Sequence, residues 1–420
     1  MGRRQALVSY FRGPLLVASG SVVLGLCSYV YLSVAARTVG PVDFGELSTL
    51  WAVVFGFVAG LWLPFEQELT RVVASGAEAS PSLADLRRVA ILQGSTLVVA
   101  EIVIVIVVSV TSGALFGGSA VLGVALAVSM LSVSVAGFQR GTLLGSRRFG
   151  WAAVQQGSDG AVRAIGAVAC AMSGASVGAF ALVLALAPFG GVLAALPGTP
   201  VVDRSRAATR AWGHLVRDVA ALLAGSYLAI VVLNIGPLVV RVSAGPAETG
   251  RFMAVFVVAR LPLFFAGPVV AGLLPSFVDA YAAGRSFVRT VRTVVLVVAV
   301  GAFAVCLVLG LLGPWLARVF FGSAYDGSLT VSIVLAVSSA LFVVAMVMQG
   351  ALVAAQDQSA VAWAWLTATV AFCLGLLLPF DVDLRVAVAY VVSGVVAVAA
   401  MSLLLSRTTT PTPTPVTDAA

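Results

Sequence analysis

Residues 40–45 read GPVDFG, and residues 245–250 read GPAETG. The two stretches share the pattern Gly-Pro-x-Asp/Glu-x-Gly, and 205 residues separate their corresponding positions. Two further pairs fall at the same separation: Gly-Ser at 20–21 with Gly-Ser at 225–226, and Phe-Gly at 116–117 with Phe-Gly at 321–322. Because several matches share one separation, we infer an internal duplication that covers nearly the whole chain.

Both copies of the repeated stretch have the composition of a tight turn followed by the start of a helix. A glycine next to a proline is a strong turn signal. An acidic side chain near a helix N-terminus is stabilised by the helix dipole. We therefore expect the shared residues to have a structural role, with a substrate contact as the alternative. They are Gly40, Pro41, Asp43 and Gly45 in the first copy, and Gly245, Pro246, Glu248 and Gly250 in the second.

The composition on both sides of these turns excludes a water-soluble protein. Hydrophobic residues make up 61% of the 420 positions and charged residues only 10%, whereas soluble proteins carry about a quarter charged residues. A bilayer span needs roughly 20 apolar residues. Apolar runs of this length lie near residues 14–36, 48–70, 89–111, 119–138, 151–172, 178–197, 218–240, 251–275, 291–313, 328–350, 360–379 and 385–405.

These runs predict an all-α polytopic membrane protein of about twelve transmembrane helices. Helices are expected because backbone groups in lipid must be paired within the segment. Six helices in each copy give both copies the same orientation, which is a parallel repeat about an axis along the membrane normal. We predict six-helix bundles at residues 1–205 and 206–407, followed by a disordered Thr/Pro tail at 408–420.

The arginines predict the orientation of the chain. All 24 positions in the lysine-plus-arginine count are arginine. Seventeen of them lie at one set of helix ends and five at the opposite set. Since cytoplasmic loops carry the excess of positive charge, both termini are expected in the cytoplasm. This loop placement explains the basic net charge without a nucleic-acid partner.

Polar residues inside the fifth predicted helix form the first candidate site. Gln156, Asp159 and Arg163 are three and four residues apart, so they share one helix face. Charged residues inside a span are costly and mark functional sites by default. Arg163 is either neutralised by Asp159, four residues earlier, or lines a cavity as a free cation.

A second candidate, Arg260, lies midway along the predicted helix at 251–275 with no acidic residue within one turn. Such an arginine needs a partner from another helix, water or an anionic substrate. Glu101, near the middle of the third predicted helix, either pairs with Arg163 or Arg260 or takes up protons. Two weaker candidates, two turns apart on the seventh predicted helix, are Tyr227 and Asn234.

Three stretches carry a resemblance to a known family: ARTVGPVDFG at 36–45, QRGTLLGSRRFG at 139–150 and FGSAY at 321–325. With them the chain resembles the multidrug/oligosaccharidyl-lipid/polysaccharide (MOP) exporter superfamily, most closely the bacterial polysaccharide flippases of the O-antigen type. The chain has no room for the two extra helices of peptidoglycan lipid flippases, and its first predicted helix lacks the acidic residue of cation-coupled drug exporters.

The resemblance implies two six-helix bundles that switch between inward and outward access in a bacterial plasma (inner) membrane. It implies a polyprenyl-pyrophosphate-linked saccharide as substrate, moved to the outer leaflet, with membrane lipids around the protein. Polysaccharide polymerases or glycosyltransferases are the implied protein partners. An arginine suits such a substrate, because its guanidinium binds phosphate oxygens in a bidentate way and stays charged.

Three functions therefore remain open. The first is a flippase for a lipid-linked oligosaccharide, with cavity arginines in contact with the pyrophosphate. The second is an H⁺- or Na⁺-coupled exporter of small molecules from the same superfamily. The third is a non-transporting scaffold of a polysaccharide synthesis complex. We predict no enzyme activity, cofactor or metal site, since the sequence has no phosphate-binding loop, no large loop and no clustered cysteines.

Overall fold

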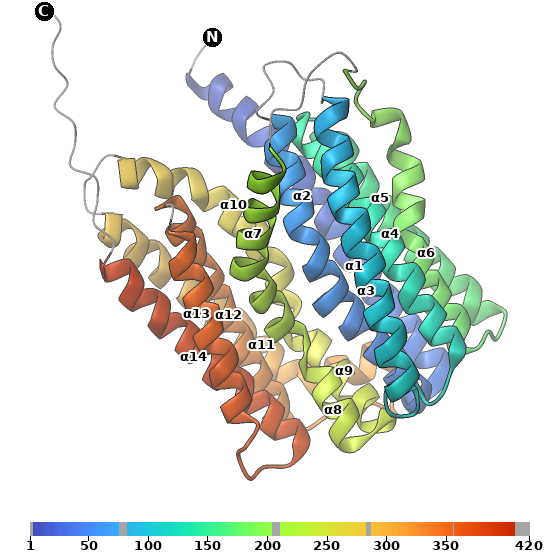
Figure 1. Cartoon of the computed structure of the whole chain (residues 1–420). Coiled ribbons are helices and arrows are strands. Elements are labelled where there is room, and N and C mark those ends of the chain that lie inside the picture. The colour runs from blue at the N-terminus through green and yellow to red at the C-terminus, as the bar shows by residue number, and fades with distance from the viewer. Residues whose placement is uncertain (1–2, 75–81, 204–210, 283–286, 356, 408–420) are drawn as a thin grey trace, which may run out of the picture. The chain divides into compact units, whose positions relative to one another are not determined.

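The computed structural model describes residues 3–74, 82–203, 211–282, 287–355 and 357–407 (Figure 1). The predicted tail at 408–420 lies outside the described residues. In the first half the helices are α1 (Arg3–Val53), the π-helical turn η1 (Val54–Val58), α2 (Ala59–Ala74), α3 (Leu83–Phe116), α4 (Ala120–Gly145), α5 (Phe149–Met172), α6 (Val177–Ala195) and the short 3₁₀ turn η2 (Leu196–Gly198). In the second half they are α7 (Trp212–Asn234), α8 (Gly236–Ala244), α9 (Pro246–Ala259), α10 (Leu261–Ala282), α11 (Phe287–Phe321), α12 (Leu329–Ala354), α13 (Gln358–Gly375) and α14 (Val382–Arg407).

Length and composition identify the membrane-spanning helices. Within the described ranges, seven helices are long and apolar enough to cross a membrane, or eight if the bent pair α7–α8 is one span. One of the seven, Leu15–Ala74, has 60 residues. At 1.5 Å per residue it would be about 90 Å long, roughly three times the hydrocarbon thickness, so it holds two of the predicted spans. The prediction of an all-α polytopic membrane protein is confirmed.

The first two predicted spans, at 14–36 and 48–70, are separated at the predicted Gly-Pro turn. The predicted turn is a kink at Gly40, the residue with non-helical angles between the two helices that make up Arg3–Val53. Gly40 has φ 79° and ψ 175°, a backbone region that is essentially restricted to glycine. The glycine of the repeated stretch therefore has the turn role expected of it.

Two predicted helices of the second half are broken. The predicted span at 218–240 is interrupted at Ile235, where the helices on either side meet at 45°. The predicted span at 251–275 is divided at Arg260, which lies between α9 and α10. Pro262 explains this second break, because proline has no amide donor and disfavours helical geometry in the residue before it.

The contacts divide the chain into two compact units. The first comprises Met1–Val255 with Pro314–Gly327, and the second Phe256–Gly313 with Ser328–Ala420. In the first unit, α7, α8 and most of α9 therefore group with α1 to α6. The predicted boundary at residue 205 was placed where the sequence duplication begins again. It differs from the division that the contacts give, and it remains a prediction.

Small residues allow close helix packing within each unit. In the first unit, α1 packs on α5 and α6, and α4 packs on α2 and α6. At Gly160 of α5, a Cβ atom would lie 2.9 Å from the Cα of Leu24. In the second unit, α12 and α13 both pack on α14, and α12 packs on α10. Since no hydrophobic effect drives helices together in lipid, such close backbone approach is the main source of packing energy.

Candidate functional site

Arg163 on α5 is neutralised by Asp159 in a bidentate ion pair. Its Nε lies 2.9 Å from Asp159 Oδ1 and its Nη2 lies 3.0 Å from Oδ2. A third contact, 3.5 Å long, joins Arg163 Nη1 to Ser28 Oγ on α1, and Gln156 accepts a hydrogen bond of 2.7 Å from Ser21 Oγ. Gln156, Asp159 and Arg163 thus share a face that packs toward α1. Of the two alternatives for Arg163, the structure has the neutralised one.

Aromatic rings complete the surroundings of this ion pair. The guanidinium carbon of Arg163 lies 5.2 Å from the ring centre of Phe55 and 6.0 Å from that of Trp51. Tyr31 stacks on Trp51 and donates a hydrogen bond to the carbonyl of Phe180. We had not predicted these aromatic residues, because they lie far from Arg163 in sequence and no local spacing connects them.

Arg260 has a different environment, within the second unit. The residue is buried, with 6% of its surface exposed. In the described part of the chain, its Nε, Nη1 and Nη2 have no hydrogen-bond partner. Its guanidinium carbon lies 4.3 Å from the ring centre of Tyr390, 4.5 Å from Phe256 and 5.3 Å from Phe342. We call Arg260 and these three rings the arginine cage.

The arginine cage stabilises charge without satisfying hydrogen bonds. Each cation–π contact contributes about 0.5–2 kcal/mol. The guanidinium nevertheless has five N–H donors and remains charged at any relevant pH. A buried charge without an acceptor costs several kcal/mol, so this site favours the arrival of an anionic group. Sequence analysis found Arg260 but missed the rings, although Phe256 stands four residues earlier, one helical turn away.

The other predicted cavity residues, Glu101, Tyr227 and Asn234, lie in the first unit and form no described contact with Arg163. Glu101 lies on α3, and the described residues include no ion pair between it and Arg163. Tyr227 and Asn234 lie on the face of α7 that packs against η1 and α2. A Cβ atom at Gly60 would be 3.1 Å from the Tyr227 ring, and one at Gly56 would be 2.9 Å from the Asn234 Cβ.

The two copies of the repeated turn contact each other, and they do so reciprocally. A Cβ atom on Gly45 would overlap the carbonyl oxygen of Pro246. A Cβ atom on Gly250 would overlap the carbonyl oxygen of Pro41. Gly45 corresponds to Gly250, and Pro41 corresponds to Pro246. Each copy therefore supplies both a glycine that approaches the other copy and a proline carbonyl that the other copy's glycine approaches. We call these four residues the glycine crossing.

The same backbone conformation occurs in both copies. Gly40 has φ 79° and ψ 175°, and Gly245 has φ 85° and ψ −178°. Matching angles and a reciprocal contact are what a two-fold axis between two parallel repeats produces. Asp43 lies three residues after Gly40, and Glu248 lies in the first turn of α9.

Residues outside the two repeated turns form hydrogen bonds with the backbone and side chains just before the first turn. Tyr325 donates a hydrogen bond of 2.8 Å to the carbonyl of Ala36. Burial raises the pKa of the Tyr325 hydroxyl, which keeps it protonated as a donor. Arg37 donates through Nε to the carbonyl of Phe320 at 2.8 Å and through Nη2 to that of Val319. The end of α11 and the segment after it are thereby tied to the part of α1 just before Gly40.

Comparisons of the sequence with known proteins find relatives but no family model. No protein-family model matches the sequence. Proteins described as uncharacterized from Mycobacterium bovis and Mycobacterium tuberculosis are 29% identical over 333 residues, which cover 74% of this chain and 75% of theirs.

Solved structures are similar over nearly the whole chain. A eukaryotic MATE transporter has a TM-score of 0.65 at 14% identity, covering 97% of this chain and 96% of that one. A MATE transporter of Vibrio cholerae, in its bent form, has a TM-score of 0.61 at 14% identity, covering 94% and 96%. A multidrug-resistance MATE transporter, in an inward-facing conformation, has a TM-score of 0.60 at 12% identity, covering 92% and 94%. The chain therefore has the fold of the MATE transporters of the MOP superfamily.

Proposed function

We propose that this protein is a membrane transporter that works by alternating access and moves a substrate with an anionic group. Support for transport comes from the fold, since a multidrug-resistance MATE transporter of this fold is described in both inward-facing and outward-facing conformations. Support for an anionic group comes from the arginine cage. Arg260 is the observation that carries the proposal, because it is buried, charged and without a hydrogen-bond acceptor among the described residues.

The chemistry of the arginine cage suits a phosphate group as the anionic group. A guanidinium fork forms two parallel hydrogen bonds to phosphate oxygens, and these charge-assisted bonds are about twice as strong as neutral ones. Phe256, Phe342 and Tyr390 exclude water, which strengthens the interaction further. A lipid-linked saccharide with a pyrophosphate bridge fits these demands, and we propose it as the substrate, moved from the inner to the outer leaflet.

Reconstitution into proteoliposomes tests this proposal. The probe is a fluorescent polyprenyl-pyrophosphate-linked sugar, and its arrival in the outer leaflet is read by quenching from outside. We expect Arg260→Gln to slow flipping, while Arg260→Lys, which keeps the charge but loses the fork, recovers part of the rate. Half-buried Arg385, whose guanidinium bonds only the carbonyl of Phe380 among the described contacts, gives the matched control Arg385→Gln.

A second candidate function is the export of small molecules driven by H⁺ or Na⁺. The observation that favours it is the likeness to transporters described as multidrug-resistance proteins. In this case Asp159, paired with Arg163, is the acidic group placed to respond to a coupling ion. Efflux of a fluorescent drug from proteoliposomes under an imposed H⁺ or Na⁺ gradient separates the two candidates. A scaffold would give neither flipping nor efflux.

A further inference from the structure

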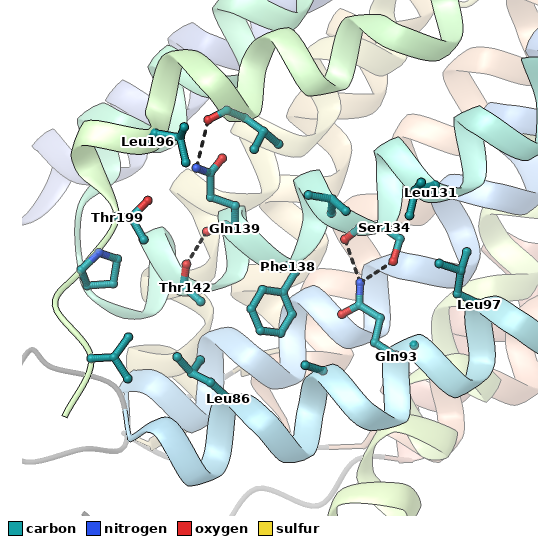
Figure 2. A pocket seen from close by; sticks show the side chains of 16 residues that line it. Leu86, Gln93, Leu97, Leu131, Ser134, Phe138, Gln139, Thr142, Leu196 and Thr199 are labelled. Carbon is teal, nitrogen blue, oxygen red and sulfur yellow. Dashed lines mark hydrogen bonds between the residues drawn. The ribbon is translucent and has the colours of Figure 1, made fainter. Parts of the chain in front are cut away.

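A groove on the first unit, with neither Arg163 nor Arg260 among its lining residues, has a volume of about 510 Å³. This volume falls within the range of about 300–1,000 Å³ that is typical of ligand sites. Residues of α3, α4 and α6 and of the segment after α6 form its walls (Figure 2). Its lining residues are Leu86, Ala90, Gln93, Gly94, Leu97, Leu131, Ser134, Val135, Phe138, Gln139, Thr142, Val192, Leu196, Thr199, Pro200 and Val202. None of them is charged.

The groove opens to the surface that faces lipid. Next to it on α3, Val98 and Val99 are 59% and 61% exposed. Leu131 and Val135, which line the groove from α4, are themselves exposed. In a membrane protein an exposed apolar surface of this kind is covered by lipid chains. An occupant therefore reaches the groove from the bilayer, and a hydrocarbon chain fits its apolar wall.

One polar atom in the wall lacks a partner. Gln93 is 4% exposed and donates its Nε2 hydrogens to the backbone carbonyl and the hydroxyl of Ser134, at 2.7 and 2.8 Å. Its Oε1 has no hydrogen-bond partner in the described part of the chain. Figure 2 shows the Gln93 side chain reaching from α3 toward Ser134, with its oxygen on the side of Phe138.

The neighbouring polar groups of the groove are already satisfied within the protein. Gln139 donates to the carbonyl of Val192 at 3.1 Å and accepts a hydrogen bond from Gln155 at 2.8 Å. The Thr142 hydroxyl donates to the carbonyl of Gln139 at 2.6 Å. A buried carbonyl oxygen without a donor is unfavourable. The groove thus combines an apolar wall with one unmatched acceptor, at Gln93.

We propose that this groove binds a neutral membrane lipid whose hydroxyl lies close to its hydrocarbon chain. The chain fills the apolar groove, and the hydroxyl donates a hydrogen bond to Gln93 Oε1. A charged headgroup does not fit, because the lining has no group of opposite charge and burying an unpaired charge is costly. The site is independent of the proposed transport function, since neither Arg163 nor Arg260 lines it.

Two variants distinguish the contribution of the lipid's hydrocarbon chain to binding from that of its hydroxyl group. Gln93→Leu removes the acceptor but keeps the apolar wall. Gly94→Leu fills the groove, and a Cβ atom at Gly94 meets no other atom within 4 Å, so the added side chain enters open space. Gly301 on α11 provides the matched control, because a Cβ atom there also meets nothing within 4 Å and Gly301 lies outside the groove.

The test uses an 18-carbon alcohol with a diazirine in its chain, and the methyl ether of the same molecule. The full-length protein in nanodiscs is labelled with each probe, and mass spectrometry locates the labelled peptides. We expect the alcohol to label α3 and α4 beside the groove about threefold to tenfold more than the ether, as one neutral hydrogen bond predicts. Gln93→Leu should remove this preference, Gly94→Leu should abolish groove labelling by both probes, and Gly301→Leu should match the unchanged protein.

Equal labelling by alcohol and ether in the unchanged protein would overturn the hydrogen bond to Gln93. Groove labelling that survives Gly94→Leu would overturn the site itself. Thermal unfolding in detergent checks that each variant is folded. If Gln93→Leu is unstable, the comparison of the two probes in the unchanged protein and in Gly94→Leu still decides the proposal.

Discussion

Placing a methyl group at either glycine of the glycine crossing should separate the two repeated turns. At Gly45 the new Cβ atom would overlap the carbonyl oxygen of Pro246, and at Gly250 that of Pro41. In both cases the obstructing atom belongs to the backbone, which moves less easily than a flexible side chain. We therefore expect Gly45→Ala and Gly250→Ala to disrupt the crossing by displacing the turns rather than by repacking side chains.

The expected cost follows from the packing. Inserting a methyl group into a closely packed site costs about 1–3 kcal/mol. If the crossing forms in only one conformation of the cycle, this cost lowers the population of that conformation by about 5- to 150-fold. Gly301→Ala is the control, because its Cβ atom meets nothing within 4 Å and alanine favours a helix over glycine by about 1 kcal/mol.

The assay is a distance measurement by double electron–electron resonance between spin labels at Val42 and Val242. Both side chains are exposed next to the crossing, at 51% and 68%. The background variant lacks the native cysteines, which are Cys27, Cys170, Cys306 and Cys373. We expect a short, narrow distance in the parent and in Gly301→Ala, and a longer, broader distribution in Gly45→Ala and Gly250→Ala. Identical distributions in all four proteins would refute the crossing as a close backbone contact.

Three further predictions concern the ion pair of Arg163 and the residues that shape or hold the repeated turns. Arg163→Ala should lower the free energy of unfolding by about 3–5 kcal/mol because it leaves the Asp159 carboxylate buried, and the double variant Asp159→Ala/Arg163→Ala should recover much of this loss in thermal unfolding. Gly40→Ala and Gly245→Ala should each cost about 1–3 kcal/mol, measured in the same way, since both glycines hold a backbone conformation that is unfavourable for alanine. Tyr325→Phe should cost about 1 kcal/mol through its lost hydrogen bond, and no change in melting temperature would contradict that bond.

The fold was predictable from the sequence because its signals are repeated and long. Apolar runs of about 20 residues predicted the helices, and the repeated turns at 40–45 and 245–250 predicted the duplication. The exact breaks were harder to predict. The break at Arg260 lies within an apolar run, where Pro262, two residues later, is the local signal for it.

The candidate sites were predictable only in part. The spacing of Asp159 and Arg163 places both on one helix face, but the sequence could not decide whether they pair. Arg260 was found because a lone charge in an apolar run is unusual. Its partners Phe342 and Tyr390 come from other helices, and no local pattern connects them to Arg260. Gln93 was missed because a neutral amide in a span is a weak signal.

The central claim is that a buried, unpaired Arg260 contacts the anionic group of the transported substrate. The most direct measurement is the rate at which proteoliposomes with Arg260→Gln flip a fluorescent polyprenyl-pyrophosphate-linked sugar, relative to the unchanged protein. Since one charge-assisted hydrogen bond is worth about 1.5–3 kcal/mol, we predict a rate lower by about 10- to 100-fold, with the protein still folded. A rate equal to that of the unchanged protein would contradict the claim.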